Sequence, residues 1–498
     1  MSSREAQAPG GIDEKQLPPG QTRPQEEAEE EEWSGAFDPF ADPEERRVLF
    51  ASLDSFRQYR RCAHRNVTHR RRQSFYALPS LHWQTLAAPP FNLLETFDKV
   101  DAAIDANAEV AEAILDSALD AFQLPRHPQR LEQARDARGS PAKDVNWHDT
   151  ATSSDISKAN STIRQLYRDW SAGGAQERET CYGPIMQDLR AEFSDSPASG
   201  TRLLIPGAGL GRLVFDTAMA GFEAEGNEIS YHQLVASSWV LNRTQRREGC
   251  AVYPFVLHFS NLRTREQQLK KVLVPDVHPG SAVRGYEEVS EGVEGRKETK
   301  KMVGSMSMTA ADFLLLYNEH SNREAFHAVA TVFFIDTAPN LIRYIQTVHH
   351  CLRPGGIWTN VGPLLWHFED RPAPSTTANK EAGEGSLGVD AAASAHAPGD
   401  DDLENEYRDH SHSHSHGHGH GHGHGHGHSH GGHGGQGEGI ADPGVVELSQ
   451  DEVLALIEKM GFTIEKVEDD IGGCGYIQDP DSMLVNMYKP VHWVVRKK

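Results

Sequence analysis

The sequence predicts an α/β fold with a doubly wound, mostly parallel sheet, and three observations support this prediction. From residue 202 onward, short apolar runs alternate with helical segments that are long enough to form βαβ units. The first run, 202–205, is followed by glycines at 207, 209 and 211 and then by a helical segment. The last two predicted strands are joined by a glycine-rich segment, which predicts an antiparallel edge on the sheet.

Each element of this core follows from a local pattern. Apolar or alternating residues predict strands at 202–205, 222–229, 328–335, 357–361, 463–469 and 491–497, and a strand-to-loop transition within 306–317. Apolar residues at helical spacing predict helices at 210–220, 231–242, 340–352 and 449–460. We therefore assign residues 197–370 and 445–498 to the α/β core, with the Lys-, Glu- and Gly-rich stretch 264–306 as a poorly ordered insertion.

Residues 43–196 are predicted to form an N-terminal helical domain. Helical spacing predicts helices at 43–72, 91–122 (one or two helices), 153–170 and 177–193, with 125–150 as a linker. Asp42 followed by Pro43 suits the start of the first helix. The run Arg70–Arg72 is typical of a nuclear localisation signal or nucleic-acid patch, but also of a solvated helix end. The negative net charge of the whole chain favours the helix end.

Two segments are predicted to be disordered by composition. Residues 1–42 form an acidic tail rich in Pro, Gly, Gln and Glu. Residues 371–444 contain twelve histidines between His410 and His433, mostly alternating with Gly or Ser. This tract supplies many equivalent imidazoles instead of one tetrahedral site, so a neutral low-complexity insertion is favoured over a specific metal site, and no metal ligand is assigned.

Composition and charge limit the class of function. A net charge of −23 argues against a general nucleic-acid binder, because phosphate repulsion would act over most of the surface. The five cysteines are widely spaced and form no CxxC, so a reducing compartment is expected. No signal-like segment or long apolar run is found, which argues against secretion and against a membrane partner.

The glycine loop indicates an adenosine-containing cofactor, and three features favour S-adenosylmethionine over a dinucleotide. Arg212 occupies the position of the third dinucleotide glycine. Glu228 ends the second strand, where it can accept both ribose hydroxyls; the alternative is a solvent-facing strand end. Asp312 and Phe313 can bind and cover an adenine ring, although Asp312 can also be a helix cap.

Asp336 ends the strongest predicted strand, in Phe334-Ile-Asp-Thr-Ala-Pro339. A side chain at the carboxyl end of a central strand faces the ligand crevice of an open α/β sheet. Many N-methyltransferases resemble this arrangement, with Asp or Asn holding the nucleophilic nitrogen. The alternative is that Asp336 caps the helix that starts near Asn340.

A more specific resemblance rests on a set of motifs: Leu204-Ile-Pro-Gly-Ala-Gly-Leu-Gly-Arg-Leu213, Gly226-Asn-Glu-Ile-Ser230, Phe334-Ile-Asp-Thr-Ala338, Gly362-Pro-Leu-Leu-Trp-His367, Asn486-Met-Tyr488, Gln165-Leu-Tyr-Arg168-Asp-Trp170 and Glu177-Arg-Glu-Thr-Cys-Tyr182. Together they closely resemble the carnosine N-methyltransferase family. The resemblance covers roughly residues 45–260 and 306–370 and resumes near 445.

This resemblance implies a class I methyltransferase fold and methyl transfer from S-adenosylmethionine to an imidazole nitrogen of β-alanyl-histidine, which gives anserine. It implies that the donor is bound by Gln165, Arg168, Gly207, Gly209, Glu228, Asp312 and Phe313, and that Asp336, His367 and Tyr488 act on the imidazole substrate. Ile205 stands where the wider superfamily has an acidic residue, so Arg168 is expected to pair with the methionyl carboxylate instead. By itself His367 would also suit a buried core position. The family further suggests a homodimer in the cytoplasm and also in the nucleus.

Two alternatives stay open at this point. The acceptor can be another histidine-containing peptide or a protein histidine, because nothing in the sequence sizes the pocket. A different class is a catalytically silent methyltransferase fold that serves as a scaffold, with the histidine tract as a metal-buffering module.

Overall fold

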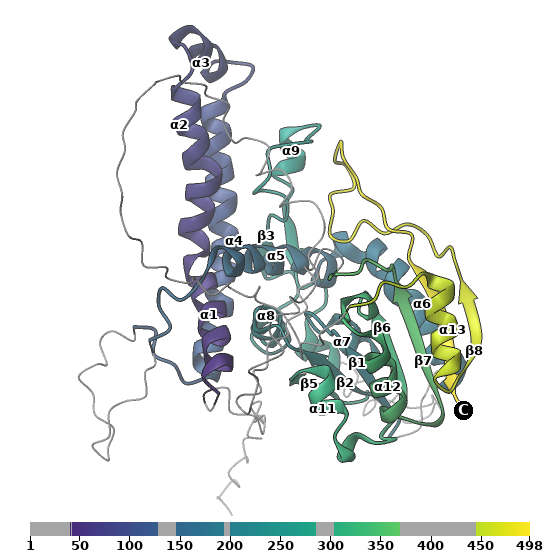
Figure 1. Ribbon diagram of the computed structural model, residues 1–498. Helices are drawn as coiled ribbons and strands as arrows, with labels where there is room; N and C mark the ends of the chain where they lie inside the picture. Colours follow the sequence, from purple (N-terminus) through teal and green to yellow (C-terminus); the bar gives the residue numbers. More distant parts are fainter. Residues whose placement is uncertain (1–39, 41, 128–145, 194–199, 285–302, 369–444) are drawn as a thin grey trace, which may run out of the picture. The chain divides into compact units, whose positions relative to one another are not determined.

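The computed structural model describes residues 40, 42–127, 146–193, 200–284, 303–368 and 445–498 (Figure 1). Its central feature is a seven-stranded sheet in the order β5-β2-β1-β6-β7-β9-β8. The strands are β1 Arg202–Pro206, β2 Glu223–Glu228, β5 Met306–Ala310, β6 Phe326–Val332, β7 Leu352–Gly362, β8 Phe462–Glu468 and β9 Val491–Lys497. The first five run parallel, and β9 pairs antiparallel with both β7 and β8. The predicted doubly wound sheet with an antiparallel edge is therefore confirmed.

Helices cover both faces of this sheet because the inner strands are apolar on both sides. In β1, Leu203 and Ile205 pack with α6 (Ala175–Phe193) and α7 (Arg212–Met219). Leu204 points to the other face, where the apolar side chains of α11, α12 and α13 gather. These helices span Phe313–Tyr317, Leu341–Cys351 and Gln450–Lys459. The predicted helices at 340–352 and 449–460 are thus confirmed to within a residue or so at each end.

The N-terminal helices are α1 Pro43–Ala63, a π-helical turn His64–His69, α2 Arg70–Tyr76, α3 Ser80–Ala87, α4 Leu93–Ala121 and α5 Ser153–Trp170. The carboxylate of Asp42 caps α1 by accepting a 2.7 Å hydrogen bond from the Glu44 amide, as the Asp-Pro pair predicted. The segment 91–122 forms one helix, α4. Arg72 pairs with Asp98 and Asp101 of α4, and the helix continues past the arginine run to Tyr76, so the run does not lie at a helix end as expected.

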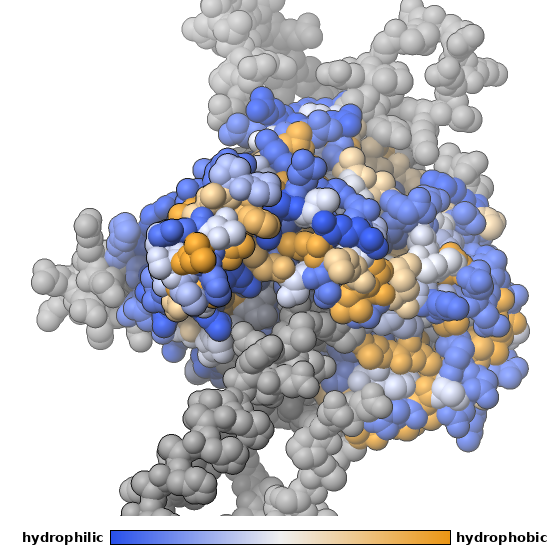
Figure 2. All heavy atoms as spheres, turned by 90° about the horizontal axis from the view of Figure 1, so that it is seen from above, coloured by the Kyte–Doolittle hydropathy of each residue, from blue (hydrophilic) through white to orange (hydrophobic). Residues whose placement is uncertain are grey.

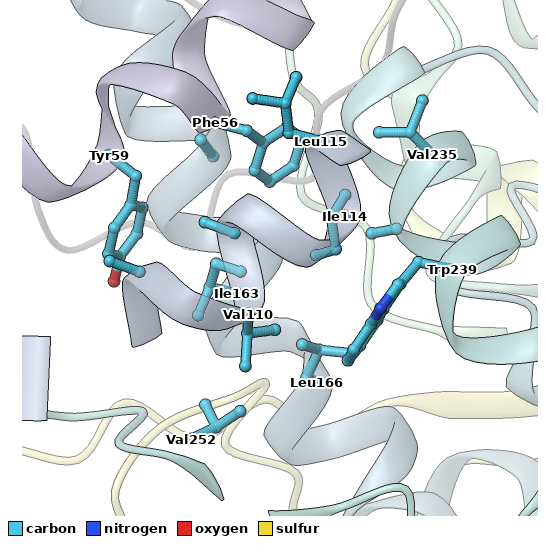
Figure 3. Packing of buried hydrophobic residues seen from close by; sticks show 14 of the residues in the cluster. Phe56, Tyr59, Val110, Ile114, Leu115, Ile163, Leu166, Val235, Trp239 and Val252 are labelled. Carbon is cyan, nitrogen blue, oxygen red and sulfur yellow. The ribbon is translucent and has the colours of Figure 1, made fainter. Parts of the chain in front are cut away.

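A large apolar core joins these helices to α8 (Tyr231–Asn242) and to a two-stranded sheet of β3 (Cys250–Val252) and β4 (Val272–Val274). Figure 3 shows Phe56 of α1, Ile114 of α4, Ile163 of α5 and Trp239 of α8 packed together. Burial of such side chains supplies the main stabilisation of the helical part. It also fixes α5, which carries two of the predicted donor-binding residues.

Two predictions about irregular segments need correction. Residues 264–284 are ordered: they contain α9 (Arg265–Gln268) and β4, whose Val272 and Val274 are buried. Trp147, inside the predicted linker 125–150, is also fully buried, and its indole N–H donates to the Pro125 carbonyl over 3.0 Å. The acidic tail (apart from residues 40 and 42), the histidine tract and residues 285–302 lie outside the described residues.

The surface seen from the α3 end mixes hydrophobic and hydrophilic side chains (Figure 2). Large exposed apolar side chains include Tyr76, Leu78 and Leu81 near α3, and a second set directly before Tyr488: Met483, Leu484, Val485 and Met487. No helix among the described residues is long and apolar enough to cross a membrane.

Candidate active site

A cavity opens at the carboxyl ends of β1, β2 and β6, which is where open α/β sheets bind ligands. Its walls come from α5, α6, the glycine loop, the segments after β2, β5 and β6, and the C-terminal segment before β9. Of the predicted donor residues, six line the cavity: Arg168, Gly207, Gly209, Glu228, Asp312 and Phe313. The structure therefore brings together residues that are far apart in the sequence.

The glycine loop adopts a backbone that side chains would obstruct. Gly207 and Gly209 have φ values of +68° and +56°, in the left-handed region. A Cβ on Gly207 would lie 2.6 Å from Cδ2 of Phe334, whereas a Cβ on Gly209 would meet no atom within 4 Å. The bare backbone thus leaves open space at Gly209 and allows close packing at Gly207.

Glu228 is buried at the end of β2 and holds the glycine loop. Its Oε2 accepts a hydrogen bond from the Gly209 amide, and its Oε1 accepts from the amides of Ile229 and Ser230, each at 2.9 Å. Burial raises the pKa of the Glu228 carboxyl, and these three amides partly offset that rise. The alternative of a solvent-facing strand end was wrong, because the residue is only 5% exposed.

Asp312 and Phe313 begin α11 at the rim of the cavity. The Asp312 carboxylate caps this helix, accepting from the Leu315 amide at 2.9 Å, so the helix-cap interpretation is confirmed. The Phe313 ring is buried and contacts Phe334 and Tyr344 edge-on. Contact of either residue with an adenine ring stays a prediction.

Arg168 enters the cavity from the last turn of α5. Its Nε and Nη2 donate to the Asp169 carboxylate at 2.7 and 3.0 Å, and its guanidinium lies 4.9 Å from the centre of the Tyr476 ring. Burial lowers the pKa of Arg168, but the charges of Asp169, Tyr182 and Tyr476 and the hydrogen bonding to Asp169 together outweigh this effect and raise it. Gln165 does not line the cavity; its Oε1 accepts a 3.0 Å hydrogen bond from Gln233, which does.

Asp336 lies in a 3₁₀ turn, Ile335–Thr337, directly after β6, and is 3% exposed. Its Oδ2 accepts from the Leu365 amide at 3.0 Å, and its backbone carbonyl accepts from the His367 amide at 3.3 Å. Burial raises the pKa of the Asp336 carboxyl to about 7. The alternative of a cap on α12 was wrong, because Asn340 caps that helix through a 3.1 Å bond from the Ile342 amide.

Tyr488 is half-buried and is held by its backbone, which exchanges two hydrogen bonds with Cys474 at 3.0 and 2.9 Å. Its ring packs edge-on against Phe333. Burial raises the pKa of the Tyr488 hydroxyl to about 12, with further contributions from the charges of Tyr476 and Asp336. Asp336, His367 and Tyr488 are not among the residues that line the cavity. Asp336 lies between the lining residues Phe334 and Thr337, and the Tyr488 ring packs against the lining residue Phe333.

Sequence reasoning missed Tyr476 and Phe333. Both have left-handed φ values, +45° and +52°, and their rings lie 4.8 Å apart. Such strained residues gather at functional sites, and both line the cavity. Glu177 of α6 holds the segment that contains Tyr476, because both of its carboxylate oxygens accept from the Ile477 amide at 3.0 Å. A tyrosine inside the run Gly472-Gly-Cys-Gly-Tyr476 was the only sequence signal for this wall of the cavity.

The strand order, the antiparallel β9 and a glycine loop tied to an acidic residue at the end of β2 define a class I methyltransferase that uses S-adenosylmethionine. The cavity residues fit this donor: a glycine loop with open space at Gly209, a carboxylate at Glu228, an aromatic ring at Phe313 and a cation at Arg168. Among the described residues, no group of three or more His, Cys, Asp or Glu side chains is arranged to hold a metal ion.

Comparison with known proteins identifies the particular family. Residues 145–498 match the carnosine N-methyltransferase family, and the chain belongs to that family. Carnosine N-methyltransferase of Schizosaccharomyces pombe is 34% identical over 68% of this chain and 83% of its own length. The enzyme of Mus musculus is 36% identical over 66% of this chain and 72% of its own length.

Solved structures are more distant. A methyltransferase from Methanosarcina mazei that depends on S-adenosylmethionine is 14% identical over 63% of this chain and 97% of its own. The TM-score of that match is only 0.27, so the fold assignment depends on the order and direction of the strands.

Proposed function

We propose that this protein transfers a methyl group from S-adenosylmethionine to an imidazole nitrogen of carnosine, which gives anserine. The observation that carries this proposal is the buried carboxyl of Asp336 in the turn that follows β6, next to residues that line a cavity suited to the methyl donor. Membership in the carnosine N-methyltransferase family supports the choice of acceptor.

The donor supplies an electrophilic methyl group on a sulfonium. For its binding we assign the ribose hydroxyls to Glu228, whose carboxylate already faces the glycine loop. We assign the adenine to Asp312 and Phe313, and the methionyl carboxylate to the guanidinium of Arg168, which also donates to Asp169. Gln165 would support this end of the site through Gln233.

The acceptor needs orientation more than activation. Imidazole has an ordinary pKa of about 6.5, so most of it is neutral at cellular pH and one ring nitrogen already carries a lone pair. The Asp336 carboxylate would accept a hydrogen bond from the other ring N–H, which fixes the tautomer. As the new N–C bond forms, the same carboxylate would stabilise the positive charge on the ring and receive its proton.

His367 and Tyr488 would complete the acceptor site. The backbone amide of His367 donates a hydrogen bond to the backbone carbonyl of Asp336, so the backbones of these two residues are held next to each other. The Tyr488 hydroxyl is close enough to Asp336 for their charges to interact. Placement of the two reactants in line accounts for much of the rate enhancement such a site can give. We also expect a homodimer located in the cytoplasm and nucleus.

A competition assay tests the choice of acceptor. The intact protein is incubated with labelled S-adenosylmethionine and, separately, carnosine, free histidine, other histidine dipeptides and a histidine-rich protein. We expect the highest kcat/KM with carnosine. A higher value with a protein histidine or another peptide would reassign the acceptor, and donor binding without transfer to any of them would favour a silent scaffold.

A further inference from the structure

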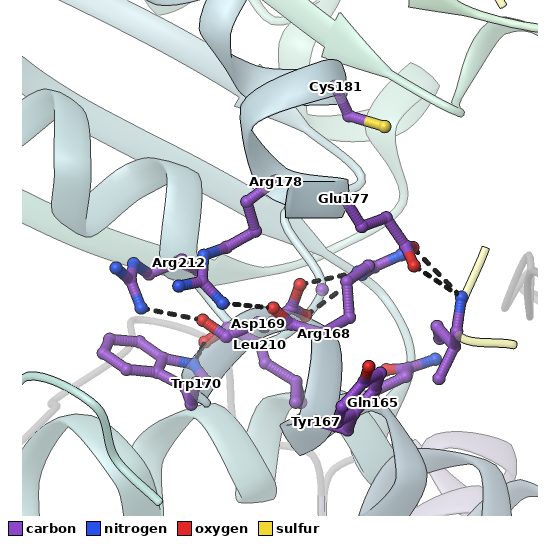
Figure 4. A network of polar contacts seen from close by, with 12 residues as sticks. Gln165, Tyr167, Arg168, Asp169, Trp170, Glu177, Arg178, Cys181, Leu210 and Arg212 are labelled. Carbon is purple, nitrogen blue, oxygen red and sulfur yellow. Dashed lines mark hydrogen bonds and ion pairs between the residues drawn. The ribbon is translucent and has the colours of Figure 1, made fainter. Parts of the chain in front are cut away.

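The C-terminal end of α5, which carries Arg168, is held by an unusual set of hydrogen bonds (Figure 4). Three consecutive backbone carbonyls at this end each accept from a residue outside the helix: Arg168 from Nη1 of Arg178, Asp169 from Nη1 of Arg212 at 2.9 Å, and Trp170 from the Asp276 amide at 2.8 Å. Two arginines at a helix C-terminus also complement its partial negative charge. The orientation of Arg168 toward the cavity therefore depends on groups outside α5.

Asp276 joins the two arginines. Its Oδ2 accepts from Nη2 of Arg178 in α6, and its Oδ1 accepts from Nη1 of Arg212 in α7, both at 2.6 Å. The three side chains are largely buried, with exposed fractions of 9% for Arg178, 11% for Arg212 and 12% for Asp276. One carboxylate thus holds two buried cations from separate helices.

Arg212 begins α7, the helix that follows the glycine loop. The Asp276 carboxylate therefore acts on two walls of the donor cavity, the end of α5 and the glycine loop with α7. On one side it fixes the end of α5 through Arg178, and on the other it fixes the start of α7. The Trp170 indole adds a direct link by donating to the Leu210 carbonyl at 3.0 Å. This arrangement sets the spacing between Arg168 and the glycine loop.

We propose that Asp276 is a positioning residue for donor binding, which sets the distance between the arginine and the glycine loop that receive S-adenosylmethionine. This inference rests on the proposed donor site. Asp276 follows β4, and its hydrogen bonds go to Arg178, Arg212 and the Trp170 carbonyl and not to the residues assigned to the adenine or ribose. Its removal would leave two largely buried guanidinium groups without their shared acceptor, and their mutual repulsion would separate the two walls.

Substitution of Asp276 by Asn and by Glu tests this role. We expect Asp276→Asn to raise the dissociation constant of S-adenosylmethionine, measured by calorimetry, at least tenfold, and to leave the KM for carnosine at saturating donor within twofold. Asp276→Glu keeps the charge and should bind the donor within threefold of the unchanged protein. The matched control is Asp216→Asn, which removes a carboxylate that pairs with Arg212 within α7 and is 31% exposed; its effect should stay below threefold.

A folded Asp276→Asn protein that binds donor within twofold of normal would overturn the proposal, and so would an equal loss with Glu and Asn. If circular dichroism shows that Asp276→Asn does not fold, Arg212→Lys gives the answer, because lysine keeps the charge but cannot reach several acceptors at once. A tenfold loss is again expected, and unchanged binding would contradict the proposal. Failure of the unchanged protein to bind donor would instead reject the donor site itself.

Discussion

The Gly209 amide donates a 2.9 Å hydrogen bond to Oε2 of Glu228, which ties the loop after β1 to the end of β2. Two strands that are neighbours in the sheet thereby share one buried contact at their carboxyl ends. The carboxylate both shapes the glycine loop and faces the cavity. Donor binding should therefore be sensitive to its charge.

Glu228→Gln is expected to weaken donor binding at least tenfold, because an amide group replaces one of two oxygens that accept from backbone N–H groups. Calorimetric titration with S-adenosylmethionine measures the loss. Glu225→Gln, in the same strand, is the control: its carboxylate pairs with Arg202 and Tyr317 away from the cavity. Equal donor affinity in both variants would contradict the ribose assignment.

Alanine substitutions separate backbone strain from loss of ligand space. Gly209→Ala should cost about 1 kcal/mol of unfolding free energy, because its φ is +56° and its Cβ meets no atom. It should also abolish measurable donor binding. Gly355 has a φ of +76°, and a Cβ there would also meet no atom within 4 Å, but this residue does not line the cavity. Gly355→Ala should therefore lower the unfolding free energy by a similar amount and leave the affinity for S-adenosylmethionine unchanged.

Gly207→Ala should be the most destabilising of the three, since its Cβ would clash with the Phe334 ring at 2.6 Å. Urea denaturation of the three proteins gives the order. A cost for Gly207→Ala no larger than that for Gly355→Ala would show that Phe334 moves aside easily.

The pH dependence of kcat/KM for carnosine should reveal Asp336. The active form needs a deprotonated Asp336, with its pKa near 7, and a neutral imidazole, with a pKa of about 6.5. Below pH 6 the logarithm of kcat/KM should therefore rise with a slope approaching 2. Asp336→Asn should lower kcat/KM about a hundredfold or more and reduce the slope to 1. A slope of 2 that persists in the variant would exclude Asp336 as the titrating group.

Stability should respond to pH in the opposite direction. The pKa of Asp336 is raised from 3.8 to about 7, so between these values the native state binds more protons than the unfolded state. The contribution of Asp336 to stability is full below pH 3.8 and is lost as the pH rises through 7. The Tm of Asp336→Asn, relative to the unchanged protein, should thus be higher at pH 8 than at pH 5. Thermal melts without ligands measure this, and the reverse trend would contradict a raised pKa.

Deletion of residues 371–440 should leave kcat/KM for carnosine within twofold, with or without a chelator. The segment is composed largely of Ala, Gly, Ser, Asp and His, and the predicted site residues on either side of it belong to the turn after β6, the 362–367 segment and the C-terminal segment. Full loss of activity on deletion, with activity kept in Asp336→Ala, would show that the site has been misplaced.

Local patterns predicted the parallel sheet, the glycine loop and the position of Glu228, because strand, loop and helix follow one another in the chain. Asp276 could not be predicted in this way, since its partners Arg178 and Arg212 lie 98 and 64 residues away in the sequence. The stretch 264–284 was misjudged because β4 is three residues long and exposes Leu273, which is too short for a strand period to emerge from its charged surroundings. Asp312 shows a further limit of prediction from sequence. An aspartate is expected at this position both if it caps α11 and if it contacts a ligand, so the sequence pattern does not distinguish the two roles.

The most direct test of the central claim follows the methyl group itself. S-adenosylmethionine labelled with ¹³C in its methyl group is incubated with carnosine and the intact protein, and the product is examined by NMR. We expect one new N-methyl signal coupled to the imidazole ring, formed at least a hundredfold more slowly by Asp336→Ala. Absence of a methyl group on either ring nitrogen, or equal rates for the two proteins, would contradict it.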